Sequence, residues 1–444
     1  KDKDMAIRSY NTKVDYEAAV KPTTESQVSL IESSREVIVD GVNVITTEPV
    51  VGDALFLDES NNKVFVKGGD WLQKAVIPSA WTFVGVVFSR EGRRVGIIDK
   101  DGDDEKYADV LQFELTGLTL DGAEHSATIG LRLSNNYNTN TTITFTYATT
   151  LLSEVVTALN AAIDARQVEI GFTNTVWAYL INGQYEKVET DEEATSIMVQ
   201  IDAWSNENQT AKSNSGCTLT FVTWRDMPAS SVYFRVNNRS TDTRGIMNIG
   251  RAESYFTTEG RTPTADVVLP EGNVAPLNKT SFETSQYCEQ VRAKYAAYRD
   301  YLLGEYLVKI PQKYGTFALP SGKELSNKYA SLLAPTKAGD TKAMFPSFYR
   351  CYNIDYNAEG LRKGDWYLPG CEEGCKFMAS ETISKMSPTM SKMGGTGISS
   401  GTNRWFAQRI SDYRARIFYR NYGNLHLTNV HNRYRRQAVA LLVI

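Results

Sequence analysis

Apolar and polar residues alternate with a period of two through most of the first 240 residues, and this period predicts β-strands. Val37–Val39 and Val42–Ile45 flank Asp40-Gly41, which is typical of a β-hairpin turn. Further strand pairs are expected over 53–58 with 63–66 and over 81–88 with 95–98. Short strands with frequent turns indicate a small β-barrel or sandwich over 36–106, which ends in a charged turn at 101–106.

A second β-rich domain is expected over 107–262. One amphipathic helix, from about Leu151 to Ala165, interrupts its strands, because apolar residues recur there at helical spacing. Strands are predicted near 111–115, 127–133, 142–147, 175–180, 196–201, 218–224 and 231–236.

The two ends of the chain follow other patterns. Residues 1–35 are polar and predict an N-terminal arm, with a short helix from Pro22 to Ser33 and with order imposed by a partner. The proline-rich segment 263–284 predicts a linker. The remainder, 285–444, is expected to be α+β, with helices from Ser281 or Thr284 to Leu303, over Gly322–Leu333 and over Glu372–Met386, followed by strands around the turn Tyr422-Gly423-Asn424.

Composition argues against some classes of function. A net charge of -4 and a pI near 5.7 argue against a dedicated nucleic-acid binder, which is usually basic over a whole domain. No run of about 18 apolar residues occurs, so no membrane insertion is expected. The N-terminal residues contain no apolar signal core, and the five cysteines are expected to be reduced thiols of a protein made in a cytoplasm.

No set of residues indicates catalysis, a metal or a cofactor. Asp99 to Asp104 matches the first half of a calcium loop, but Asp104 and Val110 stand where glycine and a bidentate acid are required, so a solvated acidic turn is expected. Cys371 and Cys375 lack two further zinc ligands at metal-site spacing. A nucleophile elbow and a phosphate-binding glycine loop are also missing from the sequence.

The last eighty residues hold the strongest candidate for binding. Within them, the tail from Arg404 to Ile444 contains a single acid, Asp412, several tyrosines and eight arginines, at 404, 409, 414, 416, 420, 433, 435 and 436. Arginine forks bind carboxylates and phosphates, and tyrosine rings stack on sugars or bases. The alternative is that these arginines form the outer face of a terminal sheet or pair with acids of a neighbouring subunit.

A family resemblance covers about 285–444. Gly364-Asp365-Trp366-Tyr367-Leu368-Pro369-Gly370, followed by Glu372-Glu373, resembles the Gly-x-Trp-x-Leu-Pro element of C-type-lectin-like domains of the formylglycine-generating-enzyme-like type. A helix, a Gly/Ser-rich stretch, a Trp-containing strand and a last strand follow in both. The chain departs from the pattern where the final Arg-Pro is Arg436-Gln437 and where Cys371 and Cys375 intrude.

The resemblance implies a scaffold with a variable ligand-binding surface, as in phage tropism determinants. The positions to which it transfers this role are Arg404, Trp405, Gln408, Arg409, Tyr413, Arg414, Tyr419, Arg420, Tyr422 and Asn424.

The N-terminal half has a looser likeness. The segments 51–58, 83–87 and 95–98 are similar to small β-modules in virion proteins of tailed phages that infect Bacteroidales, the crAss-like group among them. Together the resemblances imply a virion structural protein, a head or tail fibre that is not an enzyme. Its expected partners are two further copies of itself in a homotrimer, other virion proteins through the N-terminal arm, and a host-surface glycan or protein.

Two other classes remain open at this stage. One is an enzyme on the same lectin-like fold, an oxidase or a polysaccharide-degrading fibre; the oxidases need a reactive cysteine pair in the domain core, whereas Cys371 and Cys375 lie at the Pro-turn helix. The other is a bacterial surface adhesin.

Overall fold

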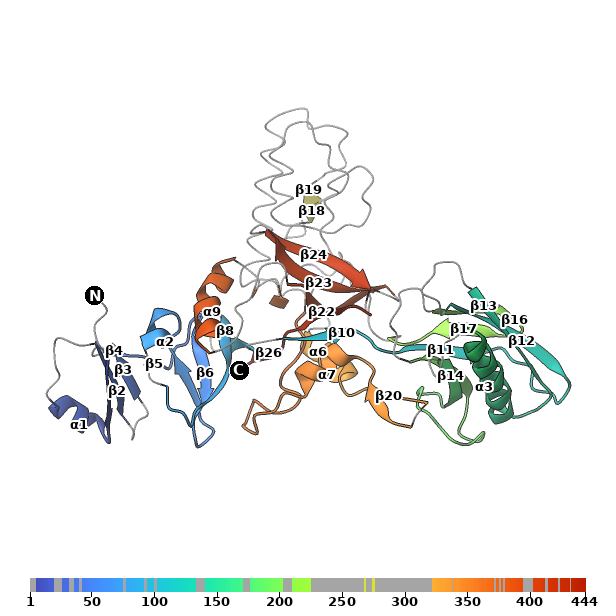
Figure 1. The fold of residues 1–444 in the computed structure, drawn as a ribbon, viewed down its shortest axis with the longest axis horizontal. Helices are drawn as coiled ribbons and strands as arrows, with labels where there is room; N and C mark the ends of the chain where they lie inside the picture. The colour runs from blue at the N-terminus through green and yellow to red at the C-terminus, as the bar shows by residue number, and fades with distance from the viewer. Residues whose placement is uncertain are drawn as a thin grey trace, which may run out of the picture.

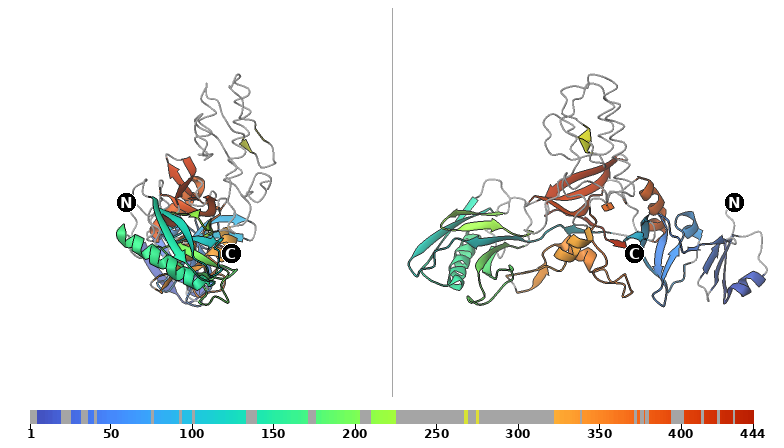
Figure 2. Two further views of the ribbon diagram at one scale, coloured as in Figure 1. Left: turned by 90° about the vertical axis from the view of Figure 1, so that its right-hand side faces the viewer. Right: turned by 180° about the vertical axis from the view of Figure 1, so that it is seen from behind.

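The structure is a computed structural model, and it shows a mainly β protein with several separate sheets. In Figure 1 the units follow one another along the long axis, and Figure 2 shows the same row from behind and end on. The described residues are 5–19, 26–31, 36–39, 42–74, 77–91, 94–99, 102–132, 140–170, 176–202, 210–224, 267–268, 274–275, 322–337, 339–370, 373–374, 377, 380–393, 402–411, 414–421, 424–431 and 433–444.

The N-terminal segment folds as a β-α-β unit. Strands β1 (Met5–Tyr10) and β2 (Ser26–Ile31) are parallel and are joined through helix α1 (Lys13–Ala18). The predicted helix over 22–33 is therefore wrong: Gln27-Val28-Ser29-Leu30 alternates with a period of two, and β2 also pairs with β3. The hairpin of β3 (Glu36–Val39) and β4 (Val42–Asn43) forms as predicted and completes the sheet β1-β2-β3-β4.

A six-stranded sheet holds most of the strands predicted over 45–98. Its order is β26-β9-β8-β6-β7-β5, and the predicted antiparallel pairings of 53–58 with 63–66 and of 81–88 with 95–98 are confirmed. Its edge strand β26 comes from the far end of the chain, with Leu441 opposite Ile98 of β9. The strands are β5 (Ile45–Thr46), β6 (Ala54–Leu57), β7 (Lys63–Val66), β8 (Thr82–Glu91), β9 (Arg94–Ile98) and β26 (Leu441–Val443), and helix α2 (Asp70–Lys74) follows β7.

The C-terminal sheet likewise includes a strand from the first part of the chain. The C-terminal sheet has the order β10-β25-β22-β23-β24, and its edge strand β10 (Asp103–Lys106) comes from the first part of the chain. The expected charged turn at 101–106 is corrected here, because this run pairs with β25 from Asp103 opposite Ala438 to Lys106 opposite Arg435. The other strands are β22 (Arg404–Ser411), β23 (Arg414–Asn421), β24 (Asn424–His431) and β25 (Arg435–Ala438).

One apolar core joins these two sheets. It contains Leu55 and Ile97 of the first sheet, Trp405 of the second, and Phe348 of helix α7, all fully buried. Residues 45–106 and 322–444 thus share two sheets and a core, whereas the sequence pattern places them in successive domains. The remaining elements around this core are α6 (Gly322–Tyr329), β20 (Leu333–Pro335), β21 (Thr341–Ala343), α7 (Pro346–Tyr352) and α9 (Ser380–Lys392).

The β-rich unit predicted from 107 onward has its own core. Two sheets, β14-β15-β11-β17 and β13-β12-β16, enclose it together with helix α3 (Leu152–Glu169), which begins within a residue of its predicted start and runs four residues further than predicted. Its strands are β11 (Leu111–Thr116), β12 (His125–Arg132), β13 (Asn140–Tyr147), β14 (Val176–Ile181), β15 (Ser196–Ile201), β16 (Thr210–Ser215) and β17 (Thr218–Phe221).

Helix α3 satisfies the outer edge of strand β14 with two side-chain amides. Gln167 accepts from the N–H of Val176 and donates to its carbonyl, both at 2.9 Å. Asn160 does the same for Ala178, at 2.7 and 2.8 Å. An exposed row of backbone groups is a template for unwanted strand pairing, so the two carboxamides protect this edge.

Most of the expected linker and the helix predicted from Ser281 or Thr284 to Leu303 lie outside the described residues. Within 263–284 the structure describes one two-stranded pair, β18 (Val267–Val268) with β19 (Val274–Ala275). Across the described residues, no helix combines the length and apolarity needed to cross a membrane.

Candidate functional site

The element Gly364–Pro369 connects the two sheets beneath the candidate binding surface. Trp366, Tyr367 and Leu368 are buried, and the backbone of Tyr367 exchanges two 2.9 Å hydrogen bonds with Leu441 of β26. The carbonyl of Pro369 accepts from Ala407 of β22 at 2.7 Å. The motif that carries the lectin-like resemblance therefore fixes β22 and β26 at once.

Glu373 fastens the turn that follows this element. Its carboxylate accepts from the Tyr367 hydroxyl at 2.6 Å and from the Gly370 N–H at 2.8 Å. The second bond, from a residue three positions earlier, is the reciprocal half of a capping box. Burial raises the pKa of Glu373, while the two hydrogen bonds oppose that rise.

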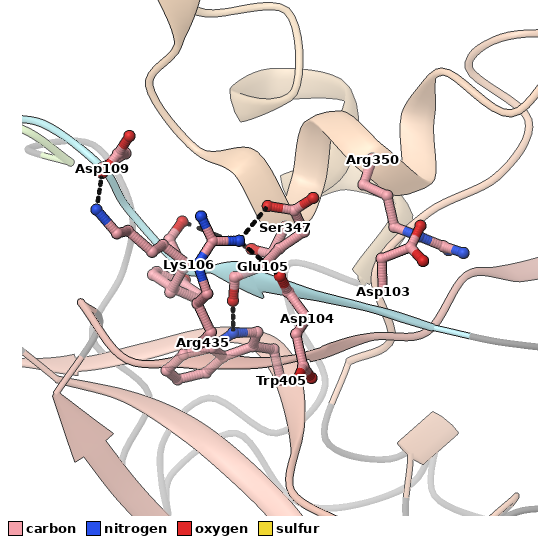
Figure 3. A network of polar contacts seen from close by, with 10 residues as sticks. Asp103, Asp104, Glu105, Lys106, Asp109, Ser347, Arg350, Trp405 and Arg435 are labelled. Atoms are coloured by element: carbon pink, nitrogen blue, oxygen red, sulfur yellow. Dashed lines mark hydrogen bonds and ion pairs between the residues drawn. The ribbon is translucent and has the colours of Figure 1, made fainter. Parts of the chain in front are cut away.

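Strand β10, the edge of the C-terminal sheet, lies beside helix α7, and Figure 3 shows polar contacts that hold it. The indole N–H of Trp405 donates to the Glu105 carbonyl at 2.8 Å. On the next strand, Nη1 of Arg435 donates to the Asp104 carbonyl at 3.0 Å. Burial raises the pKa of Glu105, with the nearby Arg435 acting in the opposite direction.

Arg350 of α7 binds two acids on and before β10 (Figure 3 labels one of them, Asp103). Its Nη2 donates to Asp99 and its Nε to Asp103, both at 2.9 Å. Asp99 is buried, whereas the side chain of Asp103 is 72% exposed. Two acids of the run that resembles a calcium loop, Asp99 and Asp103, thus bind an arginine. The expectation of a solvated turn is wrong at Asp99, which is buried.

Of the four predicted site residues whose side chains the structure describes, two are buried inside the chain. Trp405 has no exposed surface, and its ring lies 5.4 Å from that of Tyr107. Arg404 is 3% exposed, and its Nη1 donates to the Thr402 carbonyl at 2.9 Å. Burial lowers the pKa of Arg404 to about 10, so it stays charged at neutral pH. Neither side chain is available at an exposed surface.

The other predicted positions fall on the hairpin strands β22, β23 and β24 or outside the described chain. Arg409 is half-buried, and Arg414 is exposed at the start of β23. The backbone of Gln408, Tyr419, Arg420 and Asn424 lies in these strands, and their side chains are outside the description. Tyr413 and Tyr422 lie outside the described residues.

The structure adds a basic turn that the predicted set does not include. Arg433 and Tyr434 lie between β24 and β25, and Arg435 and Arg436 are the first two residues of β25. The guanidinium of Arg433 lies 4.3 Å from the centroid of the Tyr434 ring, and that of Arg436 lies 5.3 Å from it. In the sequence this cluster is visible as the run Arg433-Tyr434-Arg435-Arg436. The positions transferred from the lectin-like resemblance end at Asn424 and so do not include it.

The described thiols are not activated. Burial raises the pKa of Cys351, which is fully buried, to about 12, and it also raises the pKa of Cys217. Cys371 and Cys375 lie outside the described residues. Among the residues that are described, no three His, Cys, Asp or Glu side chains are grouped as metal ligands.

Comparison with known proteins leaves the family open. No protein-family model, no curated protein and no solved structure matches the chain.

Proposed function

We propose that this protein is a structural component of a tailed-phage virion, a head or tail fibre whose C-terminal part contacts a host-surface glycan or protein. In this proposal residues 322–444 form the α+β C-type-lectin-like part. The β-modules before it build the shaft, and the N-terminal unit attaches it to other virion proteins. The protein acts in the virion as a homotrimer.

The observation that carries the proposal is the position of the Gly364–Pro369 element. Its buried Trp366 and Leu368 lie beneath the C-terminal sheet, and its last carbonyl binds β22. A Pro turn, a helix and a terminal sheet in this order match the lectin-like pattern, in which the scaffold is rigid and the outer strands vary. The exposed Arg414 begins β23, and the basic residues 433–436 lead into β25.

The mainly β, multi-sheet architecture also supports a structural role. The units follow one another along the long axis of the molecule (Figure 1), with the C-terminal sheet between the six-stranded sheet and the β11–β17 unit, and this elongated arrangement suits a fibre. Light scattering of the purified chain should give the mass of a trimer. A strict monomer at micromolar concentration contradicts the fibre assignment.

The decisive experiment is localisation on particles. Phage purified on a density gradient should contain the protein by mass spectrometry, and antibodies against it should label a projecting structure in electron micrographs. Absence from particles, with the protein recovered only from the soluble lysate, overturns the proposal.

A further inference from the structure

The β20–β21 hairpin reaches from the shared core to the β11–β17 unit. Its base belongs to the core, where Ala334 has no exposed surface and the N–H of Met344 donates to the Leu332 carbonyl at 3.0 Å. Its two strands are antiparallel, with Leu333 opposite Ala343, and Figure 1 shows β20 between α7 and the β11–β17 unit. The hairpin is therefore placed to join the two parts of the molecule.

The far end of the hairpin contacts the β11–β17 unit at two points. The carbonyl of Pro335 accepts from Nε2 of Gln200, on β15, at 2.5 Å. In the turn that follows, Lys337 forms an ion pair with Asp164 of α3. Gln200 has no exposed surface, whereas the side chain of Asp164 is 50% exposed, so the Gln200 contact is shielded from water and the ion pair is screened by it.

Asp202 lies at the same junction, one residue beyond the end of β15. It is 7% exposed, and its carboxylate accepts from Nε2 of Gln200 at 2.5 Å and from the backbone N–H of Lys337. The same amide nitrogen of Gln200 thus binds both Asp202 and the hairpin. Whatever changes the charge of Asp202 acts directly on the contact between hairpin and unit.

The other ionisable groups near Asp202 do not cancel its charge. Lys342 of β21 attracts the carboxylate, but its Nζ also lies 3.8 Å from the carboxylate of Asp109, which repels Asp202 and pairs with Lys106 as well. Burial raises the pKa of Tyr179, which therefore faces Asp202 as a neutral phenol. Burial also raises the pKa of Asp202, and this effect outweighs the hydrogen bonds and the attraction of Lys342.

A second connection between the two parts is apolar. Trp224, which follows β17, is 1% exposed in the shared core, and its ring lies 6.1 Å from that of Tyr107. Phe221 of β17 packs against both the shared core and the core of the β11–β17 unit. This aromatic anchor contains no carboxyl, so it holds the unit in place whatever the state of Asp202.

We infer that the β20–β21 hairpin is a pH-sensitive latch, which fixes the orientation of the β11–β17 unit on the shared core and is controlled by Asp202. The closed latch holds the proton of Asp202 more tightly than an exposed aspartate does. Closure is therefore favoured at low pH and weakens as pH rises from 3.8 through the raised pKa. Once the latch opens, the unit is held by the aromatic anchor alone and can turn about it.

The test is hydrogen exchange of the full chain at several pH values from about 4.5 to 7.5, corrected for the intrinsic exchange rate at each pH. In Asp202→Asn the amide oxygen still accepts from Gln200 and Lys337 but carries no charge. Protection of peptides over 196–202 and 333–343 should fall at least about threefold across this range in the unmodified chain, relative to the variant. Peptides over 218–224 and over β8–β9 should keep their protection in both proteins.

The matched control is Asp340→Asn, which removes an exposed carboxyl from the turn of the same hairpin. It should show the pH dependence of the unmodified chain. If Asp202→Asn misfolds by circular dichroism, Lys342→Gln takes its place. This variant leaves the buried carboxylate without its lysine, so the fall in protection should become larger.

Three results overturn the inference. The first is the same pH dependence in Asp202→Asn and in the unmodified chain. The second is a loss of protection that spreads to β8–β9, because the whole molecule and not the latch would then be opening. The third is a fall in Lys342→Gln that is no larger than in the unmodified chain.

Discussion

At the scale of single residues, Arg350 binds two acids that differ in exposure. Asp99 is buried and Asp103 is largely exposed, although both oxygens lie 2.9 Å from the guanidinium. Equal geometry does not mean equal energy, because solvent screens the exposed pair and leaves the buried one strong.

We expect Arg350→Met to lower the free energy of unfolding by about 3 kcal/mol, because the buried Asp99 carboxylate loses its cation. Asp103→Asn removes only the exposed partner and should cost less than about 1 kcal/mol. Urea unfolding of both variants measures the difference. Equal costs would show that Asp99 is not electrostatically dependent on Arg350.

Glu373 gives a pH-dependent prediction. A carboxyl whose pKa is raised in the folded chain holds its proton more tightly there, so its contribution to stability is lost as pH rises from the ordinary value of 4.5 through the raised pKa. In Glu373→Gln the amide oxygen can accept from Gly370 and its NH₂ can donate to the Tyr367 hydroxyl. The variant should therefore gain stability relative to the unmodified chain as pH rises over this window.

The measurement is the urea midpoint of both proteins at several pH values from about 4 to 7, the range in which a raised Glu titrates. Taking the difference in midpoint between the two proteins removes the contributions of other carboxyls, such as Asp53, whose pKa is raised, and Asp191, whose pKa is lowered. A difference that stays constant with pH would contradict a raised pKa at Glu373.

At the scale of elements, the edge of β14 is closed by side chains instead of by another strand. Asn160 and Gln167 lie two turns apart on α3 and each binds both backbone groups of one β14 residue. Gln167 is 2% exposed, so water cannot replace its bonds.

Gln167→Met should therefore lower the free energy of unfolding by about 2 kcal/mol, because two backbone groups of Val176 lose their partner. Hydrogen exchange at the Val176 amide should become faster. Thr157→Ala, at an exposed position of the same helix, is the control and should have little effect. An unchanged exchange rate in Gln167→Met would mean that the edge is protected by something else.

Local pattern predicted the position of most strands and of α3, but not which strands pair. The apolar run Ala438–Ile444 indicates a buried strand and says nothing about its neighbour, since any edge with apolar faces accepts it. The charged run Asp103–Lys106 indicates a turn when only neighbouring residues are considered. Its partners Arg350 and Arg435, which hold it in a strand, are far away in sequence. Trp405 was assigned to a surface by resemblance, whereas its ring fills a pocket of the core beside Tyr107.

At the scale of the whole molecule, two sheets are each completed by a strand from the other part of the chain. β26 completes the sheet of β5–β9, and β10 completes the sheet of β22–β25. The unit from β11 to β17 has its own core, which includes Leu159 and Val199. Units that share a core should unfold together, and a unit with a separate core can unfold alone.

Leu442→Ala tests this cooperativity. Leu442 is 1% exposed in the shared core, so its truncation should cost about 3 kcal/mol. Hydrogen exchange should accelerate together in peptides covering β8–β9 and β22–β25, and stay unchanged in β11–β15. Val443→Ala, at a 40% exposed position of the same strand, is the matched control. Acceleration confined to β26 and β9 would show that the two sheets unfold separately.

The pairing of β26 with β9 also constrains synthesis. While the ribosome makes the middle of the chain, β9 has already emerged. Its outer edge is then unpaired, because its neighbour β26 has not yet been translated. During most of elongation the nascent chain therefore exposes the unpaired edge of β9. A chain that terminates before Leu441 keeps this edge unpaired. Chaperone supply during expression should consequently affect the yield of this protein.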